Sequence, residues 1–415
     1  MRDDPQRLRF EIDARDGAAR TGRLHTSHGP VETPAFVPLA TRGAVRTLSS
    51  ADVAALGYRL VLGNTFHLFL SPGPERVAEL GGLHRFMGWE RAIVTDSGGF
   101  QVFSMAHGNV ADEIKGRRGA AAPSGGAVEI SERGVAFRSY VDGSKRFLGP
   151  EESMATQAAL GSDIALSFDE CTPYHADRDY TARSTERTQR WLERSLAWHA
   201  EHGPADQAVF GIVQGGVHED LRRISAEGTA AAAADGLAIG GTLGRDKEQM
   251  HGVVELTASL LPGEPAKHLL GIGEPDDLLV GIGIGIDTFD CAVPTRLARH
   301  GMALAPLPAS RFRFDVARAA YATDEGPLVD GCECATCARH TRAYLHYLCR
   351  AEELTAGRML TIHNLAFLER LLAGARRAIR AGQLLLYCQP KLDLADRTIN
   401  SVEILVRWWH PDRGM

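Results

Sequence analysis

Long apolar runs are missing from this 415-residue chain. Because no stretch of 18 or more residues is apolar throughout, we expect no membrane-spanning helix. Residues 1–10 are charged and lack the apolar centre of a secretory signal, so we expect no such signal. Cysteine is scarce as well: of seven, three are crowded between Cys332 and Cys337, which argues against a disulfide framework. Together these absences predict a cytoplasmic protein with no membrane partner.

An excess of positive charge is also missing. The formal net charge is −6, which argues against a protein that coats nucleic acid through bulk electrostatics. A local basic groove on an acidic body remains compatible with this charge. Residues 115–118, Arg296 and Arg299 could supply such a patch, or they could be ordinary solvated charges.

Short apolar runs alternate with longer amphipathic stretches, such as 181–202 and 247–260, and this alternation indicates strands and helices in turn. The strand-like runs are 59–62, 92–95, 164–168, 209–213, 237–239, 268–272 and 286–289. Small or polar residues follow each run directly. In a parallel barrel those strand ends form the catalytic face, so we expect an α/β fold of the (β/α)₈ (TIM) barrel type. A doubly wound open sheet would give the same alternation and stays open as an alternative.

A metal-ligand pattern lies near the C-terminus. Cys332, Cys334 and Cys337 are followed by His363, which begins a helical pattern running toward residue 380. Three thiolates and one imidazole complete a tetrahedral shell, so we expect a structural Zn²⁺ rather than a catalytic one. A fourth nearby cysteine is missing, which disfavours an iron–sulfur cluster. The remaining alternative is three free cysteines and an unrelated histidine.

Two aspartates follow strand-like runs. Asp96 begins the turn Asp96-Ser97-Gly98-Gly99, and Asp290 follows the run 286–289. A carboxylate beside a sugar can attack the anomeric carbon and later be displaced, while a second carboxylate moves the proton of the departing or incoming group. Such a pair suits glycosyl exchange, but it also suits other reactions, and an isolated Asp-Ser-Gly-Gly turn is more often a helix cap.

Read in order, the segments from about residue 10 to 382 resemble the tRNA-guanine transglycosylase (queuine tRNA-ribosyltransferase) family. The matching segments are Thr33-Pro34-Ala35-Phe36, Asn64-Thr65-Phe66-His67-Leu68, 96–104, Leu160-Gly161-Ser162-Asp163-Ile164, Phe168-Asp169-Glu170-Cys171, 211–216, 285–296, the cysteine–histidine set and His363-Asn364-Leu365. The resemblance implies exchange of guanine at the wobble position of tRNAs with a GUN anticodon for a 7-deazaguanine, through a covalent aspartyl–ribosyl intermediate.

The resemblance also implies roles for individual residues. Asp290 would be the nucleophile and Asp96 the general acid and base. The contacts to the base would come from Ser97, Phe100, Asp163, Gln214, Gly241 and Leu270, with Phe100 and Leu270 on its two faces. Arg296 and Arg299 would contact the anticodon loop. The family further implies a homodimer with the zinc region, at about 325–370, near the interface.

The rim of the base pocket departs from the common bacterial pattern. Where many members read Gly-Gly-Leu-Ala-Val-Gly-Glu, this chain reads Gly240-Gly241-Thr242-Leu243-Gly244-Arg245-Asp246 and is one residue shorter. A small residue at this rim is associated with queuine, which is bulkier than preQ1. We therefore hypothesise that the pocket accepts a base larger than preQ1.

Residues 383–415 depart from the family. The segments 386–394 and 402–411 resemble the start of an EAL (cyclic-di-GMP phosphodiesterase) domain, with Glu403-Ile404-Leu405 in place of Glu-Ala-Leu. Because a complete barrel needs about 200 residues or more, we expect an incomplete tail after a barrel that spans 1–382. An ordinary diverged C-terminus is the alternative.

Two rival functions remain. A non-catalytic tRNA-binding partner subunit would be favoured by loss of either aspartate, but both Asp96 and Asp290 are present. A cyclic-di-GMP-related fusion protein is supported only by the tail.

Overall fold

The computed structural model describes residues 8–107, 128–241, 244–384, 386–392 and 399–406. Within these residues the largest sheet has nine strands in the order β4-β15-β14-β13-β12-β11-β7-β6-β5. They are β4 (Ala35–Val37), β5 (Leu39–Ala40), β6 (Leu60–Gly63), β7 (Ala92–Thr95), β11 (Ile164–Leu166), β12 (Ala208–Val213), β13 (Gly236–Ile239), β14 (Ala266–Leu269) and β15 (Thr288–Asp290).

The sheet closes into a barrel. β4 and β5 are consecutive parts of one strand interrupted at Pro38; β4 pairs with β15 and β5 pairs with β6, both in parallel. Counted as one, they give the eight strands of a (β/α)₈ barrel among the described residues. The predicted barrel is therefore confirmed, and the open doubly wound sheet is wrong.

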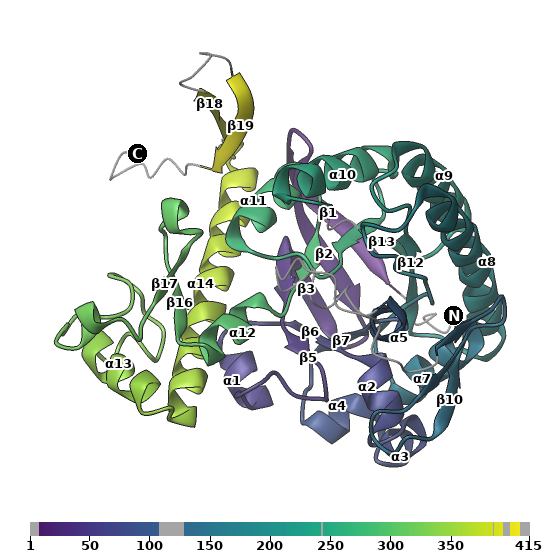
Figure 1. Cartoon of the computed structure of the whole chain (residues 1–415), viewed down its shortest axis with the longest axis horizontal. Coiled ribbons are helices and arrows are strands. Elements are labelled where there is room, and N and C mark those ends of the chain that lie inside the picture. Colours follow the sequence, from purple (N-terminus) through teal and green to yellow (C-terminus); the bar gives the residue numbers. More distant parts are fainter. Residues whose placement is uncertain (1–7, 108–127, 242–243, 385, 393–398, 407–415) are drawn as a thin grey trace, which may run out of the picture.

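Helices surround the barrel in a ring (Figure 1). They are α1 (Ser50–Ala55), α2 (Thr65–Leu70), α3 (Pro74–Glu79), α4 (Gly82–Met87), α5 (Gly99–His107), α7 (Pro150–Leu160), α8 (Arg178–His202), α9 (Glu219–Ala231), α10 (Lys247–Leu260), α11 (Pro275–Gly283) and α12 (Val293–Arg299). The start of α10 follows from its sequence, because the Asp246 side chain accepts a hydrogen bond from the amide of Gln249 at 2.9 Å. No helix of the described residues is long and apolar enough to cross a bilayer.

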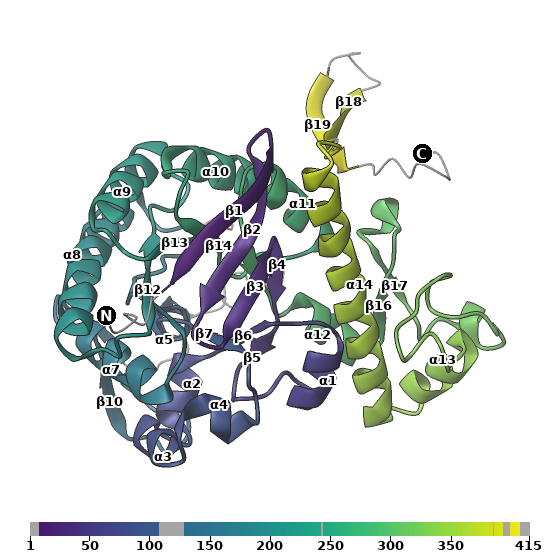
Figure 2. The same ribbon diagram turned by 180° about the vertical axis from the view of Figure 1, so that it is seen from behind.

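An antiparallel sheet that the sequence patterns did not reveal covers the N-terminal end of the barrel. It consists of β1 (Arg9–Asp16), β2 (Ala19–Thr26) and β3 (Gly29–Thr33), and Figure 2 shows it lying across the strands. Leu24 and Val31 of this sheet belong to the same apolar cluster as Val37, Leu62 and Ile212 of the barrel. The sheet therefore closes the bottom of the barrel and leaves the opposite end for chemistry.

A smaller sheet and a C-terminal subdomain complete the fold. The sheet contains β8 (Glu129–Ile130), β9 (Val135–Arg138) and β10 (Lys145–Leu148). The subdomain contains β16 (Met302–Leu304), β17 (Arg313–Asp315), the 3₁₀ turns Pro308–Ser310 and Ala319–Tyr321, α13 (Arg342–Arg350) and α14 (Leu354–Arg380). After α14, β18 (Leu386–Leu392) and β19 (Ile399–Val406) form an antiparallel hairpin that projects beyond the helix end (Figure 1).

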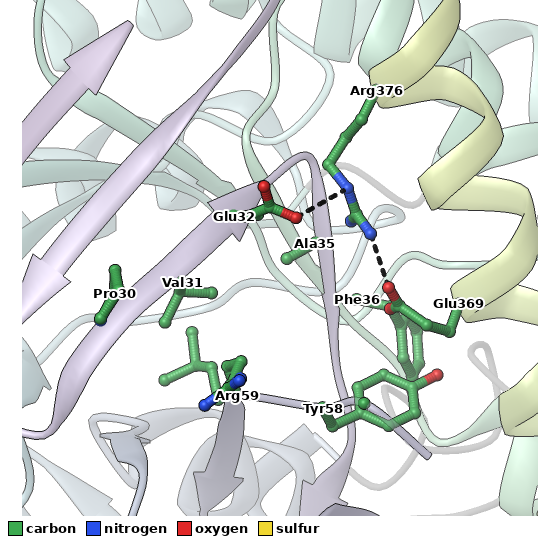
Figure 3. A pocket seen from close by; sticks show the side chains of 11 residues that line it. Pro30, Val31, Glu32, Ala35, Phe36, Tyr58, Arg59, Glu369 and Arg376 are labelled. Carbon is green, nitrogen blue, oxygen red and sulfur yellow. Dashed lines mark hydrogen bonds and ion pairs between the residues drawn. The ribbon is translucent and has the colours of Figure 1, made fainter. Parts of the chain in front are cut away.

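Helix α14 fastens the subdomain to the barrel. Tyr58 donates its hydroxyl to the carbonyl of Leu365 at 2.9 Å, and Arg376 donates to the carbonyl of Pro34 at 2.8 Å and to Glu369 at 2.6 Å. Figure 3 shows Arg376 between Glu32 and Glu369 above a cavity of about 340 Å³. This cavity lies at the N-terminal ends of β4 and β6, so it is remote from the end of the barrel that carries the polar residues.

Candidate active site and metal centre

The C-terminal ends of the barrel strands bring most of the predicted site residues to one face. Asp290 ends β15, and Asp96 and Ser97 follow β7 directly. Gln214, Gly241 and Leu270 follow β12, β13 and β14 in the same way. Phe100 lies in the first turn of α5, and Arg296 and Arg299 lie on α12 just after Asp290. Parallel strands place these positions at the barrel mouth.

Asp96 is held by donors from the end of the neighbouring strand β6 and from helix α5. Its Oδ1 accepts the amide of Thr65 at 2.8 Å, and its Oδ2 accepts the side-chain amides of Asn64 and, at 3.3 Å, Gln101. Burial raises the pKa of Asp96 to about 7 against the Thr65 hydrogen bond, and the negative charge of Asp290 raises it further. The Asp96 carboxyl can therefore hold or release a proton near neutral pH. Asn64 was not among the predicted site residues.

Asp290 is buried at the end of β15, which β6 and the β4–β5 strand separate from β7 around the barrel. Its Oδ1 accepts hydrogen bonds from Nε2 of His268 and from the amide of Gly271, both at 3.0 Å. The two hydrogen bonds offset the free-energy cost of burying a carboxylate away from water. Together Asp290 and Asp96 form a pair of carboxyl groups that interact electrostatically.

A third carboxyl group, that of Asp169, lies after β11 at the same end of the barrel. Its Oδ1 accepts the hydroxyl of Ser97 at 2.7 Å and its Oδ2 accepts the side-chain amide of Gln214 at 2.6 Å. Burial raises the pKa of Asp169 to about 6 in spite of these hydrogen bonds. The predicted base contacts Ser97 and Gln214 thus converge on an acid to which no role was assigned.

Asp163 does not lie at the mouth, so its predicted contact with the base is wrong. It precedes β11 and therefore lies at the N-terminal end of the barrel. Its carboxylate accepts hydrogen bonds from Ser27 at 2.9 Å, from His28 at 2.8 Å and from His84 at 3.2 Å. Burial opposes ionisation, but the hydrogen bonds from His84, the Ile93 amide and His28 hold the pKa of Asp163 well below its usual range. Asp163 anchors the β2–β3 turn to the barrel floor.

We expect Asp163→Asn and Asp169→Asn to separate stability from base binding. Because Asp163 is buried and accepts several hydrogen bonds, Asp163→Asn lowers the free energy of unfolding by about 3 kcal/mol and leaves KM for the base nearly unchanged. Asp169→Asn raises KM for the base about tenfold or more, because an amide cannot accept from two donors of a purine edge. Thermal unfolding and base-exchange kinetics measure both. A raised base KM in Asp163→Asn alone would contradict this assignment.

Gly241 has two reasons to be glycine. Its φ is +61°, and a Cβ added there would lie 2.2 Å from Oε1 of Gln214. Its carbonyl accepts a hydrogen bond from the buried guanidinium of Arg222 at 2.6 Å, and Arg222 also donates to the carbonyl of Gly216 at 2.8 Å. Arg222 therefore fixes the loops after β12 and β13, so that the backbone can approach a ligand closely.

Arg46, Arg296 and Arg299 lie close together beside the mouth, and Arg42 joins them through His67 of α2, which lies near both Arg42 and Arg46. No ion pair joins them to a carboxylate within the described parts of the chain. Burial lowers the pKa of Arg299, and the charges of Arg46 and Arg296 lower it further, so these groups are close enough to repel one another. Arg42 and Arg46 were not predicted, because nothing in their local sequence marks them as partners of Arg296 and Arg299. An unneutralised positive patch of this kind favours a polyanion.

The four predicted metal ligands do converge. Ligand atoms of Cys332, Cys334, Cys337 and His363 lie within 4.8 Å of one another, so the cluster could hold a metal ion. The sulfurs lie 3.7, 3.7 and 3.2 Å from Nδ1 of His363, near the separation of about 3.6 Å that tetrahedral zinc–sulfur and zinc–nitrogen bonds require. Nε2 of His363 donates to the carbonyl of Leu304 at 2.8 Å, which leaves Nδ1 free to bind a cation.

The position of His363 in its helix differs from the prediction. α14 begins at Leu354, so His363 lies well inside the helix rather than at its head. The next residue, Asn364, accepts the amide of Leu304 at 2.7 Å and donates to the carbonyl of Pro294 in α12 at 3.0 Å. The metal cluster is thereby linked through one turn of α14 to the helix that follows Asp290.

Parts of three predictions lie outside the described residues: the basic segment 115–118 in its loop, Thr242 and Leu243 at the pocket rim, and the segments 393–398 and 407–415 of the tail. For the remainder of the rim, Asp246 caps α10 and pairs with the exposed Arg245 at 3.1 Å.

The fold and the mouth together define a (β/α)₈-barrel enzyme with a two-carboxylate site. A sequence model of the family described as queuine tRNA-ribosyltransferase matches residues 15–394. The queuine tRNA-ribosyltransferase of Roseiflexus sp. (strain RS-1) is 49% identical over 91% of this chain and 97% of its own length. Those of Symbiobacterium thermophilum and Thermus thermophilus are 46% and 47% identical over 90% and 91% of this chain, and over 88% and 91% of their own lengths. The chain belongs to the queuine tRNA-ribosyltransferase family.

Proposed function

We propose that this enzyme exchanges guanine at the wobble position of tRNAs with a GUN anticodon for a 7-deazaguanine. The observation that carries the proposal is the Asp96–Asp290 pair at the mouth of a barrel that belongs to this family. Asp290 forms a bond to C1′ of the ribose as the bond from C1′ to N9 breaks, and Asp96 gives its proton to the leaving guanine. The incoming base then returns a proton to Asp96, its N9 attacks C1′, and Asp290 leaves.

The pocket chemistry supports a guanine-like ligand. The carboxylate of Asp169 offers acceptors that suit the N1–H and exocyclic amine of guanine, and Oε1 of Gln214 is buried without a hydrogen-bond partner. An unpartnered buried acceptor costs about 1–3 kcal/mol unless a ligand supplies the donor. Phe100 and Leu270, both half-buried at the mouth, supply the faces between which a planar ring would stack.

The arginine patch supports tRNA as the partner. Arg296 and Arg299, together with Arg42 and Arg46, offer positive charge next to the nucleophile, where the phosphates of an anticodon loop would lie. The alternatives are not favoured: a non-catalytic partner subunit has no need of both carboxylates, and a cyclic-di-GMP function rests on the tail alone.

The ion that suits the Cys332, Cys334, Cys337 and His363 cluster is Zn²⁺. Three thiolates and one imidazole leave no open coordination position, so the zinc would have a structural role only. Its function would be to hold the cysteine loop against α14.

The exchange reaction itself tests the proposal. tRNA with a GUN anticodon should incorporate labelled guanine, and tRNA with another anticodon should not; equal labelling of both, or of neither, would contradict the assignment.

A second experiment, in which the label is chased with preQ1 and with queuine, tests which base the pocket rim admits. Because Asp246 is committed to capping α10, we expect queuine to be accepted as well as preQ1. Release of label by preQ1 alone would overturn that expectation.

We expect the kcat/KM for tRNA to follow a bell-shaped pH profile with its maximum between pH 6 and 7. Asp96 must carry a proton to release guanine, and with a pKa of about 7 it loses that proton as the pH rises above 7. Asp169 must be ionised to accept from the base, and with a pKa of about 6 it becomes protonated below pH 6. Asp96→Asn should lower the rate about 10²–10⁴-fold and remove the alkaline limb. An alkaline limb that persists in Asp96→Asn would show that another group supplies the proton.

We also propose a homodimer that acts in the cytoplasm, where its tRNA substrate is found. Tyr344 and Tyr347 on α13 and Leu354 at the start of α14 are exposed, which supports an interface beside the zinc cluster. A monomer mass in analytical ultracentrifugation, or recovery outside the cytoplasmic fraction, would contradict these points.

A further inference from the structure

A histidine inside the barrel contacts the nucleophile. His268 and Thr288 are register partners in the adjacent strands β14 and β15, so both side chains point to the same face of the sheet. Asp290 lies two residues beyond Thr288 and shares that face. Nε2 of His268 lies 3.0 Å from Oδ1 of Asp290, and its Nδ1 lies 2.8 Å from the hydroxyl of Thr288. The His268 side chain is 3% exposed, so water does not compete for these contacts.

Asp290 sets the direction of the hydrogen bonds. A carboxylate oxygen can only accept, so Nε2 of His268 donates to Oδ1, and the hydroxyl of Thr288 can then donate to Nδ1 and hold the ring in this orientation. The chain from Thr288 through His268 to Asp290 therefore holds the His268 ring at both of its nitrogens.

The two oxygens of Asp290 are consequently different. Oδ1 accepts from His268 and from the amide of Gly271, whereas Oδ2 accepts no hydrogen bond from any described residue. We propose that His268 is a positioning residue that, with the Gly271 amide, clamps Oδ1 of Asp290 and so commits Oδ2 to the bond with C1′. This inference rests on the proposed transglycosylation.

The clamp acts in both halves of the exchange. When Oδ2 bonds to C1′, the electron pair of the C1′–N9 bond passes to guanine with the proton of Asp96, and Oδ1 becomes the carbonyl oxygen of an ester. When the incoming base attacks C1′, the Oδ2–C1′ electron pair returns to the carboxylate. The donors of His268 and Gly271 are already in place for the charge that develops on it, so no reorganisation is needed at that moment.

Matched substitutions separate this role from a packing role. In His268→Gln the amide nitrogen stands as many bonds from Cβ as Nε2, so the donor to Asp290 is kept. In His268→Asn the amide nitrogen stands where Nδ1 was and cannot reach Asp290. Thr288→Val retains His268 but removes the hydroxyl that holds its ring through Nδ1.

The experiment measures guanine exchange into GUN tRNA by these variants, beside the wild type and Asp290→Asn. We expect His268→Asn to lower kcat about 10- to 100-fold with KM for tRNA within about twofold, and His268→Gln to recover all but about fivefold. We expect Thr288→Val to lower kcat about 3- to 10-fold. Equal rates for His268→Asn and His268→Gln, at any level, would overturn the proposal.

The controls distinguish this proposal from the one on which it rests. No exchange by the wild type, or full exchange by Asp290→Asn, would contradict the proposed function itself. Normal controls with a fully active His268→Asn would overturn the clamp alone. If His268→Asn does not fold, Thr288→Val tests the proposal instead, because a wild-type kcat in that variant would overturn it.

Discussion

Asp290→Asn should abolish guanine exchange, with a loss of at least about 10⁴-fold in kcat. Asparagine keeps the shape of the side chain, and its Oδ1 can still accept from His268 and Gly271. Its amide nitrogen stands in the place of Oδ2 and cannot form the ester with C1′. The substitution therefore removes the attacking atom and little else, so tRNA affinity and thermal stability should stay near those of the wild type.

Asp276→Asn is the matched control for that loss. Asp276 lies in the first turn of α11 at the same end of the barrel, where it pairs with Lys247 at 2.7 Å. Asp276→Asn removes one unit of negative charge, as Asp290→Asn does, but leaves both Asp96 and Asp290 in place. We expect exchange within about threefold of the wild type; a loss comparable to that of Asp290→Asn would mean that charge at the mouth, rather than a nucleophile, controls the rate.

Removal of the zinc ion proposed for the Cys332, Cys334, Cys337 and His363 cluster should unfold the C-terminal subdomain and stop catalysis together. Structural zinc sites contribute about 10 kcal/mol or more of binding free energy. Losing even half of that lowers Tm by roughly 10 °C in a protein of this size. The reason that activity follows is the link from His363 through Asn364 to Pro294, which holds α12 and the end of β15 in place.

Cys334→Ala and Cys349→Ala give this prediction its control. Cys334 belongs to the ligand cluster, whereas Cys349 is a half-buried cysteine of α13 outside it. Cys334→Ala should lose metal, measured by elemental analysis, together with stability and exchange. Cys349→Ala should retain one metal per chain. A Cys334→Ala protein with wild-type Tm and activity would contradict a structural metal at this site.

The C-terminal ends of the strands could be predicted from sequence because small or polar residues directly follow each apolar run. The runs ending at Thr95 and Val213 correctly placed Asp96 and Gln214 at the mouth. Asp163 was misplaced because it precedes its strand, and in a parallel barrel a residue before a strand lies at the opposite end. Asp169 follows that strand, so its position alone could have indicated that it lies at the mouth.

Other features depend on contacts that local patterns do not reveal. β1 alternates in exposure and most of β2 is buried because the sheet covers the barrel floor. That contact cannot be seen in the local sequence, so the bottom sheet was not predicted. His268 is the polar first residue of the run 268–272, and its proposed role follows from the pairing register of β14 with β15. The Arg42, Arg46, Arg296 and Arg299 patch joins segments that are distant in the sequence. The metal ligands, by contrast, could be predicted because their residue types and spacing specify the chemistry directly.

The covalent intermediate is the most direct test of the account. Enzyme incubated with GUN tRNA and no free base should yield a denaturation-resistant protein–RNA complex, and addition of a 7-deazaguanine should release modified tRNA. Digestion and mass spectrometry should locate the ribosyl ester on Asp290, and Asp290→Asn should form no complex. An ester on another residue, or exchange without any covalent complex, would contradict the proposal that Asp290 is the nucleophile.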